Sequence, residues 1–217
     1  MNNLKLFLFL IPLTFLSCVS GDIYSELARN IFNLLSEPED IDQSKIESIP
    51  YASMQVRLGR SENTLLILEE EKNGILKWTS SNLIKIYTKN GFIVRLTGLD
   101  NELDQIELDK KHPIITGNFN KNIKSLTSFY TFNKPKLFRL PVKTNFKFIR
   151  NEPVNILGKM VPARLYEEIS TGNLISWQFK NLYWINDQNE IIKSVQNFTP
   201  KNPEIYLKLT KKYKKPE

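Results

Sequence analysis

Residues 51–99 read YASMQVRLGRSENTLLILEEEKNGILKWTSSNLIKIYTKNGFIVRLTGL, and this stretch decides the fold class. Apolar and polar side chains alternate along it, as at Met54 and Val56, which is the pattern of a strand with one buried face. The Asn-Gly pairs at 73–74 and 90–91 tolerate the positive φ that tight hairpins need. The stretch therefore predicts a five-stranded antiparallel meander.

The rest of the chain is also rich in strands. Residues 100–125 are polar and charged, with Pro113 and Gly117, and predict a long crossover. Further strands are predicted at 127–132, 144–150, 163–169, 175–179, 182–185, 191–198 and 204–209. We therefore predict a mainly β protein of about eleven antiparallel strands in two or more curved, packed sheets, a β-sandwich architecture with one N-terminal amphipathic helix.

The first eighteen residues, MNNLKLFLFLIPLTFLSC, have the layout of a secretory signal. One positive charge at Lys5 precedes an apolar core that is too short to span a bilayer. Cys18, the only cysteine, follows a small residue at the end of this core, as in bacterial lipoproteins. We expect lipid attachment at Cys18, with an ordinary signal peptide and an incidental cysteine as the alternative.

Lipid on Cys18 has consequences for location and chemistry. The mature chain would then contain no thiol, hence no disulfide, no cysteine-based metal site and no thiol nucleophile. Val19 and Ser20 lack the aspartate that favours retention in the inner membrane of Gram-negative bacteria. We therefore expect a lipid-anchored protein on the periplasmic face of the outer membrane.

One helix is predicted, at residues 22–35, where Ile23, Leu27 and Ile31 share a face. The formal net charge is +7, with many lysines near the C-terminus, but a periplasmic location makes nucleic acid an improbable partner. The expected organisation is a signal peptide at 1–17, a lipidated N-terminus with helix and linker at 18–50, a single β-rich domain at 51–210 and a basic tail at 211–217.

The residues that catalysis would need are scarce. The only histidine, His112, lies in the predicted crossover, where no nucleophile turn and no partner for a histidine-based metal site are near it in sequence. Glycoside cleavage needs only two carboxylates. The clusters at 69–71 and 167–168, however, are typical of solubilising charge at strand edges. We therefore expect a protein that is not an enzyme and uses no cofactor and no metal.

Sugar binding is a more natural use of these side chains. Aromatic faces stack on pyranose rings, and arginine hydrogen-bonds hydroxyl and carboxylate groups. The candidate contact residues for a glycan or a protein partner are Arg57, Arg60, Trp78, Arg95 and Trp184. An ordinary role stays open for each: core packing for the tryptophans, and solvation or charge pairing for the arginines.

Short elements follow one another along the chain in a specific order and spacing: Tyr51 to Gly59, Leu65 to Leu68, Trp78, Asn90-Gly91, Gly98-Leu99, Asn181 to Trp184, Lys193-Ser194, Pro200 and Pro203. This order and spacing give the chain a resemblance to the YjbF/GfcB family of bacterial lipoproteins. It implies an outer-membrane lipoprotein encoded among genes for capsule or exopolysaccharide secretion. It also implies an all-β fold of curved sheets, and it assigns no catalytic residue.

Together these observations favour a non-enzymatic accessory of capsule or exopolysaccharide secretion. Its expected partners are the outer membrane, through the lipid, and the polysaccharide or the proteins that export it. One alternative is a periplasmic carrier of lipid or acyl chains, which would need a large apolar cavity. A less favoured alternative is a glycan-modifying enzyme, which would need two carboxylates in an open cleft.

Overall fold

A computed structural model describes residues 40–81, 83–119, 123–172, 177–198 and 202–214. The predicted signal peptide, Cys18 and the helix at 22–35 lie outside these residues. No helix in the described part of the chain has the length and hydropathy needed to cross a membrane.

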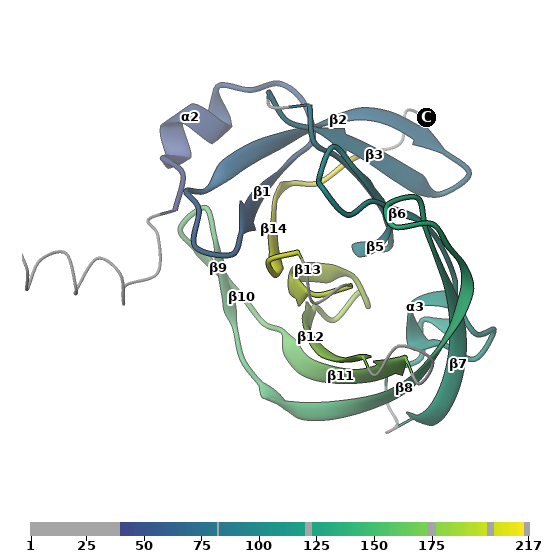
Figure 1. The fold of residues 1–217 in the computed structure, drawn as a ribbon. Helices are drawn as coiled ribbons and strands as arrows, with labels where there is room; N and C mark the ends of the chain where they lie inside the picture. The colour runs from purple at the N-terminus through teal and green to yellow at the C-terminus, as the bar shows by residue number, and fades with distance from the viewer. Residues whose placement is uncertain (1–39, 82, 120–122, 173–176, 199–201, 215–217) are drawn as a thin grey trace, which may run out of the picture. The chain divides into compact units, whose positions relative to one another are not determined.

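The described residues form fourteen strands, of which twelve close into one antiparallel barrel (Figure 1). Around the ring the order is β1-β14-β13-β12-β11-β8-β7-β6-β5-β4-β3-β2, and β9 and β10 form a separate two-stranded sheet. The strands are β1 (Ser53–Leu58), β2 (Thr64–Lys72), β3 (Ile75–Thr79), β4 (Lys85–Lys89), β5 (Phe92–Thr97), β6 (Leu103–Glu107), β7 (Ile123–Phe132), β8 (Leu137–Asn151), β9 (Val154–Ile156), β10 (Lys159–Val161), β11 (Arg164–Gly172), β12 (Trp177–Ile185), β13 (Ile191–Gln196) and β14 (Ile205–Lys211).

The prediction of two or more packed sheets in a β-sandwich is wrong. The first and last strands of the chain pair with each other, with Val56 opposite Leu207, so the sheet has no free edge and closes on itself. The alternation of side chains shows only which face of a strand is buried. Strands bury one face in a sandwich and in a barrel, so this pattern is the same in both architectures. Only the pairing of β1 with β14 distinguishes the two architectures.

The predicted linker and crossover contain regular structure as well. Helix α2 (Gln43–Glu47) begins at the cap residue Asp42 and buries Ile46. In the crossover, β6 adds a strand to the barrel and the short helix α3 (Pro113–Thr116) follows it. Both helices are too short for a periodic pattern to reveal them. Residues 175 and 176 of the strand predicted at 175–179 lie outside the described residues; its described part and the segment predicted at 182–185 fall in one strand, β12, which begins at Trp177.

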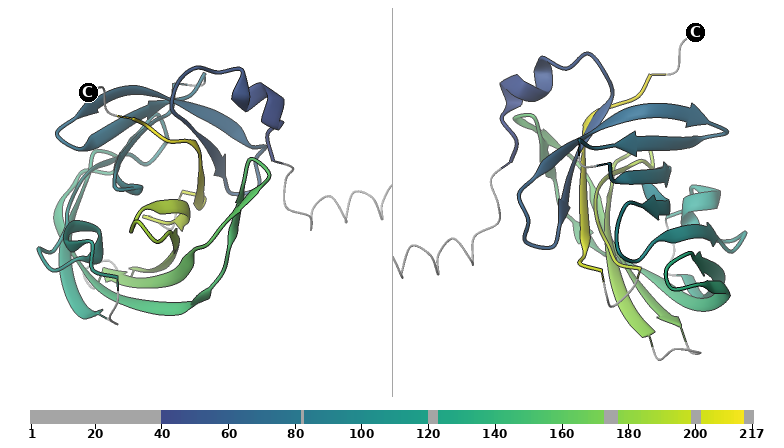
Figure 2. Two further views of the ribbon diagram at one scale, coloured as in Figure 1. Left: turned by 180° about the vertical axis from the view of Figure 1, so that it is seen from behind. Right: turned by 45° about the horizontal axis from the view of Figure 1, so that its top comes forward.

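A second, smaller core lies on the outer wall of the barrel. Its buried members, from β9, the turn before β11, and β11 to β13, are Val154, Ala163, Leu165, Trp184 and Ile192. The β9–β10 hairpin extends from the long pair β8 and β11 toward α2 in all three views of Figures 1 and 2. In the segment before α2, Asp40 accepts hydrogen bonds from Gln55 and Lys208 on the outer faces of β1 and β14.

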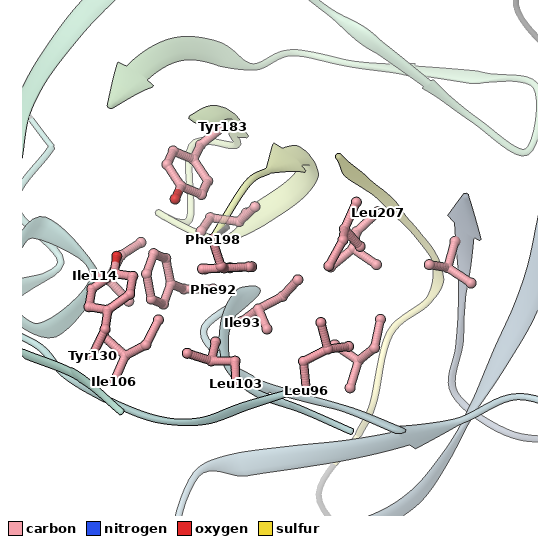
Figure 3. Close-up of a cluster of buried hydrophobic side chains, with 14 of the residues drawn as sticks. Phe92, Ile93, Leu96, Leu103, Ile106, Ile114, Tyr130, Tyr183, Phe198 and Leu207 are labelled. Atoms are coloured by element: carbon pink, nitrogen blue, oxygen red, sulfur yellow. The ribbon is translucent and has the colours of Figure 1, made fainter. Parts of the chain in front are cut away.

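The main core lies inside the barrel, and one hairpin turn crosses it. The Asn-Gly turns predicted at 73–74 and 90–91 are confirmed, with φ of +76° at Gly74 and +81° at Gly91. The second turn joins β4 to β5 and reaches β13, where the amide of Ile93 donates to Gln196 (3.0 Å) and Gln196 donates to the carbonyl of Gly91 (3.2 Å). Figure 3 shows Phe92 and Ile93 among side chains from several other strands.

This contact pinches the barrel. Strands β5 and β13 are six positions apart in either direction around the ring, so they lie on opposite walls. A Cβ atom on Gly91 would nevertheless lie only 2.6 Å from the Cβ of Ile191. One core cluster continues across the pinch. We call the part of the interior bounded by β6, β7, β8, β11 and β12 the closed compartment, and the part bounded by β14, β1, β2, β3 and β4 the open compartment.

Candidate functional site: the open compartment of the barrel

The open compartment contains a hollow of about 760 Å³. This volume lies in the range of roughly 300–1,000 Å³ that is usual for small-molecule sites. Its apolar wall is built by inward-facing side chains of β1, β3 and β14: Met54, Leu76, Trp78, Leu207 and Leu209. Every second residue of a strand points inward, so the period-two pattern of these strands produces this wall directly.

Trp78 forms part of the floor of the hollow and is almost fully buried. Its indole N–H donates to the hydroxyl of Thr88 on β4 (2.9 Å). Because this donor is satisfied within the protein, the small part of the indole that borders the hollow is apolar. Gly91, at the pinch, closes the hollow on the side of the closed compartment.

The rim of the hollow is polar. Lys212 forms an ion pair with Glu190, which follows the β12–β13 turn. Glu71 accepts a hydrogen bond from the amide of Gly74 in the β2–β3 turn (3.0 Å). The other polar rim residues are Asn90, Gln188, Asn189 and Lys193. The hollow thus combines an apolar interior with a ring of hydrogen-bonding groups.

The closed compartment instead holds a buried carboxylate. Glu168 on β11 is only 1% exposed, and it accepts hydrogen bonds from Tyr183 (2.5 Å), Asn181 (3.1 Å) and Ser170 (3.2 Å). Burial raises the pKa of Glu168, but the interactions with His112, Tyr183 and Asn181 outweigh burial and hold that pKa below its ordinary value. Burial and then the charge of Glu168 raise the pKa of Tyr183 well above its usual range.

His112 lies beside this carboxylate and is completely buried. It caps helix α3, and its Nδ1 accepts a hydrogen bond from the amide of Ile114 (3.3 Å). In the neutral ring the proton therefore lies on Nε2, which is 3.8 Å from Glu168 Oε1. Phe92 and Phe146 pack near the imidazole ring. A histidine and a carboxylate thus meet here, but within a closed core.

The structure links two of the sequence-predicted contact residues. On the outer faces of β1, β14, β13 and β12, the guanidinium of Arg57 lies over Tyr206 (4.8 Å), and the ammonium of Lys193 lies over both Tyr206 (5.5 Å) and Trp184 (4.3 Å). Trp184 also donates to Glu152 (2.9 Å) and belongs to the outer core. Cation–π contacts therefore join Arg57 to Trp184 along four neighbouring strands.

The other predicted residues lie elsewhere. Trp78 is inside the barrel, Arg60 is exposed in the turn after β1, and Arg95 on β5 pairs with Asp104 on β6 (3.4 Å). Cys18 lies outside the described residues. The five contact candidates therefore do not form one site, and among them only Trp78 lines the hollow of the open compartment.

Sequence reasoning missed the buried role of Glu168 and the contribution of Tyr213 to the hollow. The period-two pattern of β11 alternates Tyr166, Glu168 and Ser170 on one face, and Tyr166 on that face was a signal that it turns inward. Tyr213 lines the hollow but lies in the segment predicted as a basic tail, and no local pattern relates it to a cavity wall.

Fold and site together define a pinched twelve-stranded antiparallel barrel protein with a ligand-sized hollow at one end. The family model for the group 4 capsule polysaccharide lipoprotein GfcB, YjbF matches residues 15–209. The chain therefore belongs to the YjbF family of lipoproteins, and the resemblance seen in the sequence is confirmed.

Individual relatives agree with this assignment. The uncharacterized lipoprotein GfcB of Escherichia coli K12 is 22% identical over 147 residues, which cover 67% of this chain and 69% of that protein. The uncharacterized lipoprotein YjbF of the same organism is 25% identical over 158 residues, which cover 70% of this chain and 71% of that protein. The crystal structure of the hypothetical lipoprotein YmcC from Escherichia coli K12 shares the fold, with a TM-score of 0.70 at 19% identity over 91% of this chain and 98% of that one.

Proposed function

We propose that this chain is a lipid-anchored, non-enzymatic accessory in capsule or exopolysaccharide secretion, held at the periplasmic face of the outer membrane through Cys18. The observation that carries the proposal is the match of residues 15–209 to the group 4 capsule polysaccharide lipoprotein family. The signal-like first eighteen residues, which end in the only cysteine, support the anchor.

The geometry of the carboxylates supports a non-enzymatic role. Glu168, which has the histidine beside it, is sealed in the closed compartment, where protein donors occupy its oxygens. At the rim of the hollow, Glu190 is paired with Lys212 and Glu71 is tied to the amide of Gly74. Each of these carboxylates is held by the protein itself, whereas a glycosidase aims two of them at one bond.

The experiment that tests the proposal compares a deletion strain with strains that carry Cys18→Ala or, as a matched control, Ser20→Ala. We expect deletion to lower surface polysaccharide, Cys18→Ala to release the protein from the outer-membrane fraction and lower the polysaccharide too, and Ser20→Ala to change neither. Normal polysaccharide in the deletion strain would refute the proposed function. If Cys18→Ala releases the protein but the amount of surface polysaccharide stays normal, the function does not need the lipid anchor.

A second measurement tests the non-enzymatic part. The purified lipoprotein is incubated with the secreted polysaccharide of the producing strain, and chain length and reducing ends are followed. We expect no change in either quantity. Shortening of the polymer would show that the protein is a glycan-modifying enzyme.

A further inference from the structure

The hollow of the open compartment continues across the rim of the barrel. A second hollow of about 490 Å³ adjoins it, lined by residues before β1, by the end of β2 and by the chain after β14. Glu71, Lys212 and Tyr213 line both hollows. The two hollows therefore adjoin along these three residues, and we call the pair the rim groove; the inner hollow lies within the barrel and the outer one beside its rim.

Aromatic side chains are spaced along the rim groove. Tyr51 lies in the outer hollow and is 62% exposed, Tyr213 stands where the two hollows meet, and Trp78 forms the floor at the inner end. Aromatic faces are apolar surfaces on which the C–H face of a sugar ring can stack. Hydrogen-bonding groups of the rim, including Asn90 and Gln188, lie beside them.

The rim groove carries no excess of positive charge. Its lining contains four carboxylates, from Glu69, Glu70, Glu71 and Glu190, and two ammonium groups, from Lys212 and Lys214. Lys193 also borders the inner hollow, but its ammonium lies on the outer face over Trp184. Glu69 is hydrogen-bonded to Lys77 (2.6 Å), and Glu190 is paired with Lys212. A site for a strongly anionic polymer would carry an excess of positive charge. An acyl-chain site would be lined by apolar side chains to its mouth.

We propose that the rim groove binds an extended oligosaccharide segment of neutral or weakly charged sugars. Tyr51 and Tyr213 stack on sugar rings, the amides and charged groups of the rim hydrogen-bond the hydroxyls, and the segment ends over Leu76. This inference rests on the proposed function, because it identifies the chemical class of ligand that such an accessory would hold. It adds a site in which the barrel contacts the polymer directly.

The test uses the full-length lipoprotein in phospholipid nanodiscs and oligosaccharides released by partial acid hydrolysis of the secreted polysaccharide of the producing strain. Titration calorimetry compares the wild type with the double variant Tyr51→Ala/Tyr213→Ala. Phe138→Ala is the matched control, because Phe138 is an aromatic side chain that is 82% exposed and lines neither hollow. We expect the double variant to bind about tenfold more weakly or worse, and the control to bind like the wild type.

Two calorimetric outcomes would overturn the inference: the wild type does not bind the oligosaccharides, or the double variant binds them as tightly as the wild type does. A third outcome comes from native mass spectrometry: an acyl-chain lipid co-purifies with the wild type and is absent from the double variant. Circular dichroism of each variant checks that it is folded. Secretion in strains that carry the same variants separates this inference from the proposed function. If deletion abolishes secretion but the double variant binds and secretes normally, then oligosaccharide binding in the rim groove is refuted and the proposed function stands.

Discussion

The two compartments of the barrel are built from the same kind of strand and differ in what fills them. In the closed compartment, Phe146 lies against Tyr166 and Tyr183, with ring centroids 5.3 and 5.8 Å apart, and Glu168 is surrounded by donors. In the open compartment, the side chains of Leu76 and Leu209 face a hollow of about 760 Å³. In both compartments the alternation of residues along the strands produces an inward face. The volume of the inward side chains and the position of the Gly91 turn decide which compartment keeps a hollow.

The largest difference between the two compartments is expected when one apolar side chain in each is truncated to alanine. Phe146→Ala should lower the free energy of unfolding by about 4 kcal/mol, because it leaves a cavity in a filled core. Leu76→Ala should cost only about 1 kcal/mol, because Leu76 is half-buried and already faces a hollow. Urea unfolding followed by circular dichroism measures both values. Similar losses at the two positions would mean that the compartments are packed alike.

The pinch is tested by the two Asn-Gly turns. Gly91→Ala should cost about 3 kcal/mol, because positive φ strains alanine and the new Cβ would lie 2.6 Å from Ile191. Gly74→Ala carries the same backbone strain, but no atom lies within 4 Å of the new Cβ, so its cost should be about 1 kcal/mol. Equal melting temperatures for the two variants would show that the β4–β5 turn does not touch β13.

The buried carboxylate of Glu168 should make the free energy of unfolding depend on pH. The pKa of Glu168 is lowered in the folded chain, so its stabilisation is present above its unfolded pKa near 4.5 and is lost as pH falls through the lower folded value. Glu168→Gln should cost about 2 kcal/mol at neutral pH, since hydrogen bonds to a charged group are lost. The loss should shrink as the solution is acidified below pH 4.5.

Glu167→Gln is the matched control, because Glu167 is the next residue in the chain and its carboxylate pairs with Lys180 (3.4 Å) on the barrel surface. It should change stability by less than about 0.5 kcal/mol. Unfolding free energies of the three proteins from pH 7 to pH 3 provide the measurement. Parallel curves for the wild type and Glu168→Gln would refute a charged Glu168 in the folded state.

The smallest effect on stability is expected from filling the open compartment. Leu76→Phe adds volume where space already exists, so the unfolding free energy should change by less than about 0.5 kcal/mol. The same variant should weaken binding of the oligosaccharides about tenfold, because the larger ring occupies the inner end of the rim groove. Unchanged affinity, measured by calorimetry, would place the ligand outside the open compartment.

Much of the fold could be predicted from local sequence. The alternation in residues 51–99, the two Asn-Gly turns and the later strands identify a mainly β, antiparallel protein. The order and spacing of motifs such as Tyr51 to Gly59 identify the family. The strands and turns depend on residues within a few positions of each other, so a pattern in the chain is enough to reveal them.

The candidate site could be predicted only in part. Trp78 was a candidate contact residue and lines the hollow, whereas Arg57 and Trp184 share an outer face and Arg95 lies on another wall. Glu168 was read with Glu167 as surface charge, because two adjacent carboxylates look alike in sequence although a strand turns them to opposite faces. Tyr213 joins the rim groove through contacts with distant strands.

The sequence by itself determined most of the barrel strands, the two Asn-Gly turns and the family. Tertiary structure alone decided that β1 pairs with β14 to close a barrel, that Gly91 but not Gly74 is pressed against an opposite wall, and that Glu168 is buried while Glu167 is not. The physical reason is distance along the chain. Backbone preference and side-chain alternation are local, but closure, pinching and cavity volume depend on which remote strands meet and how completely their side chains fill the space between them.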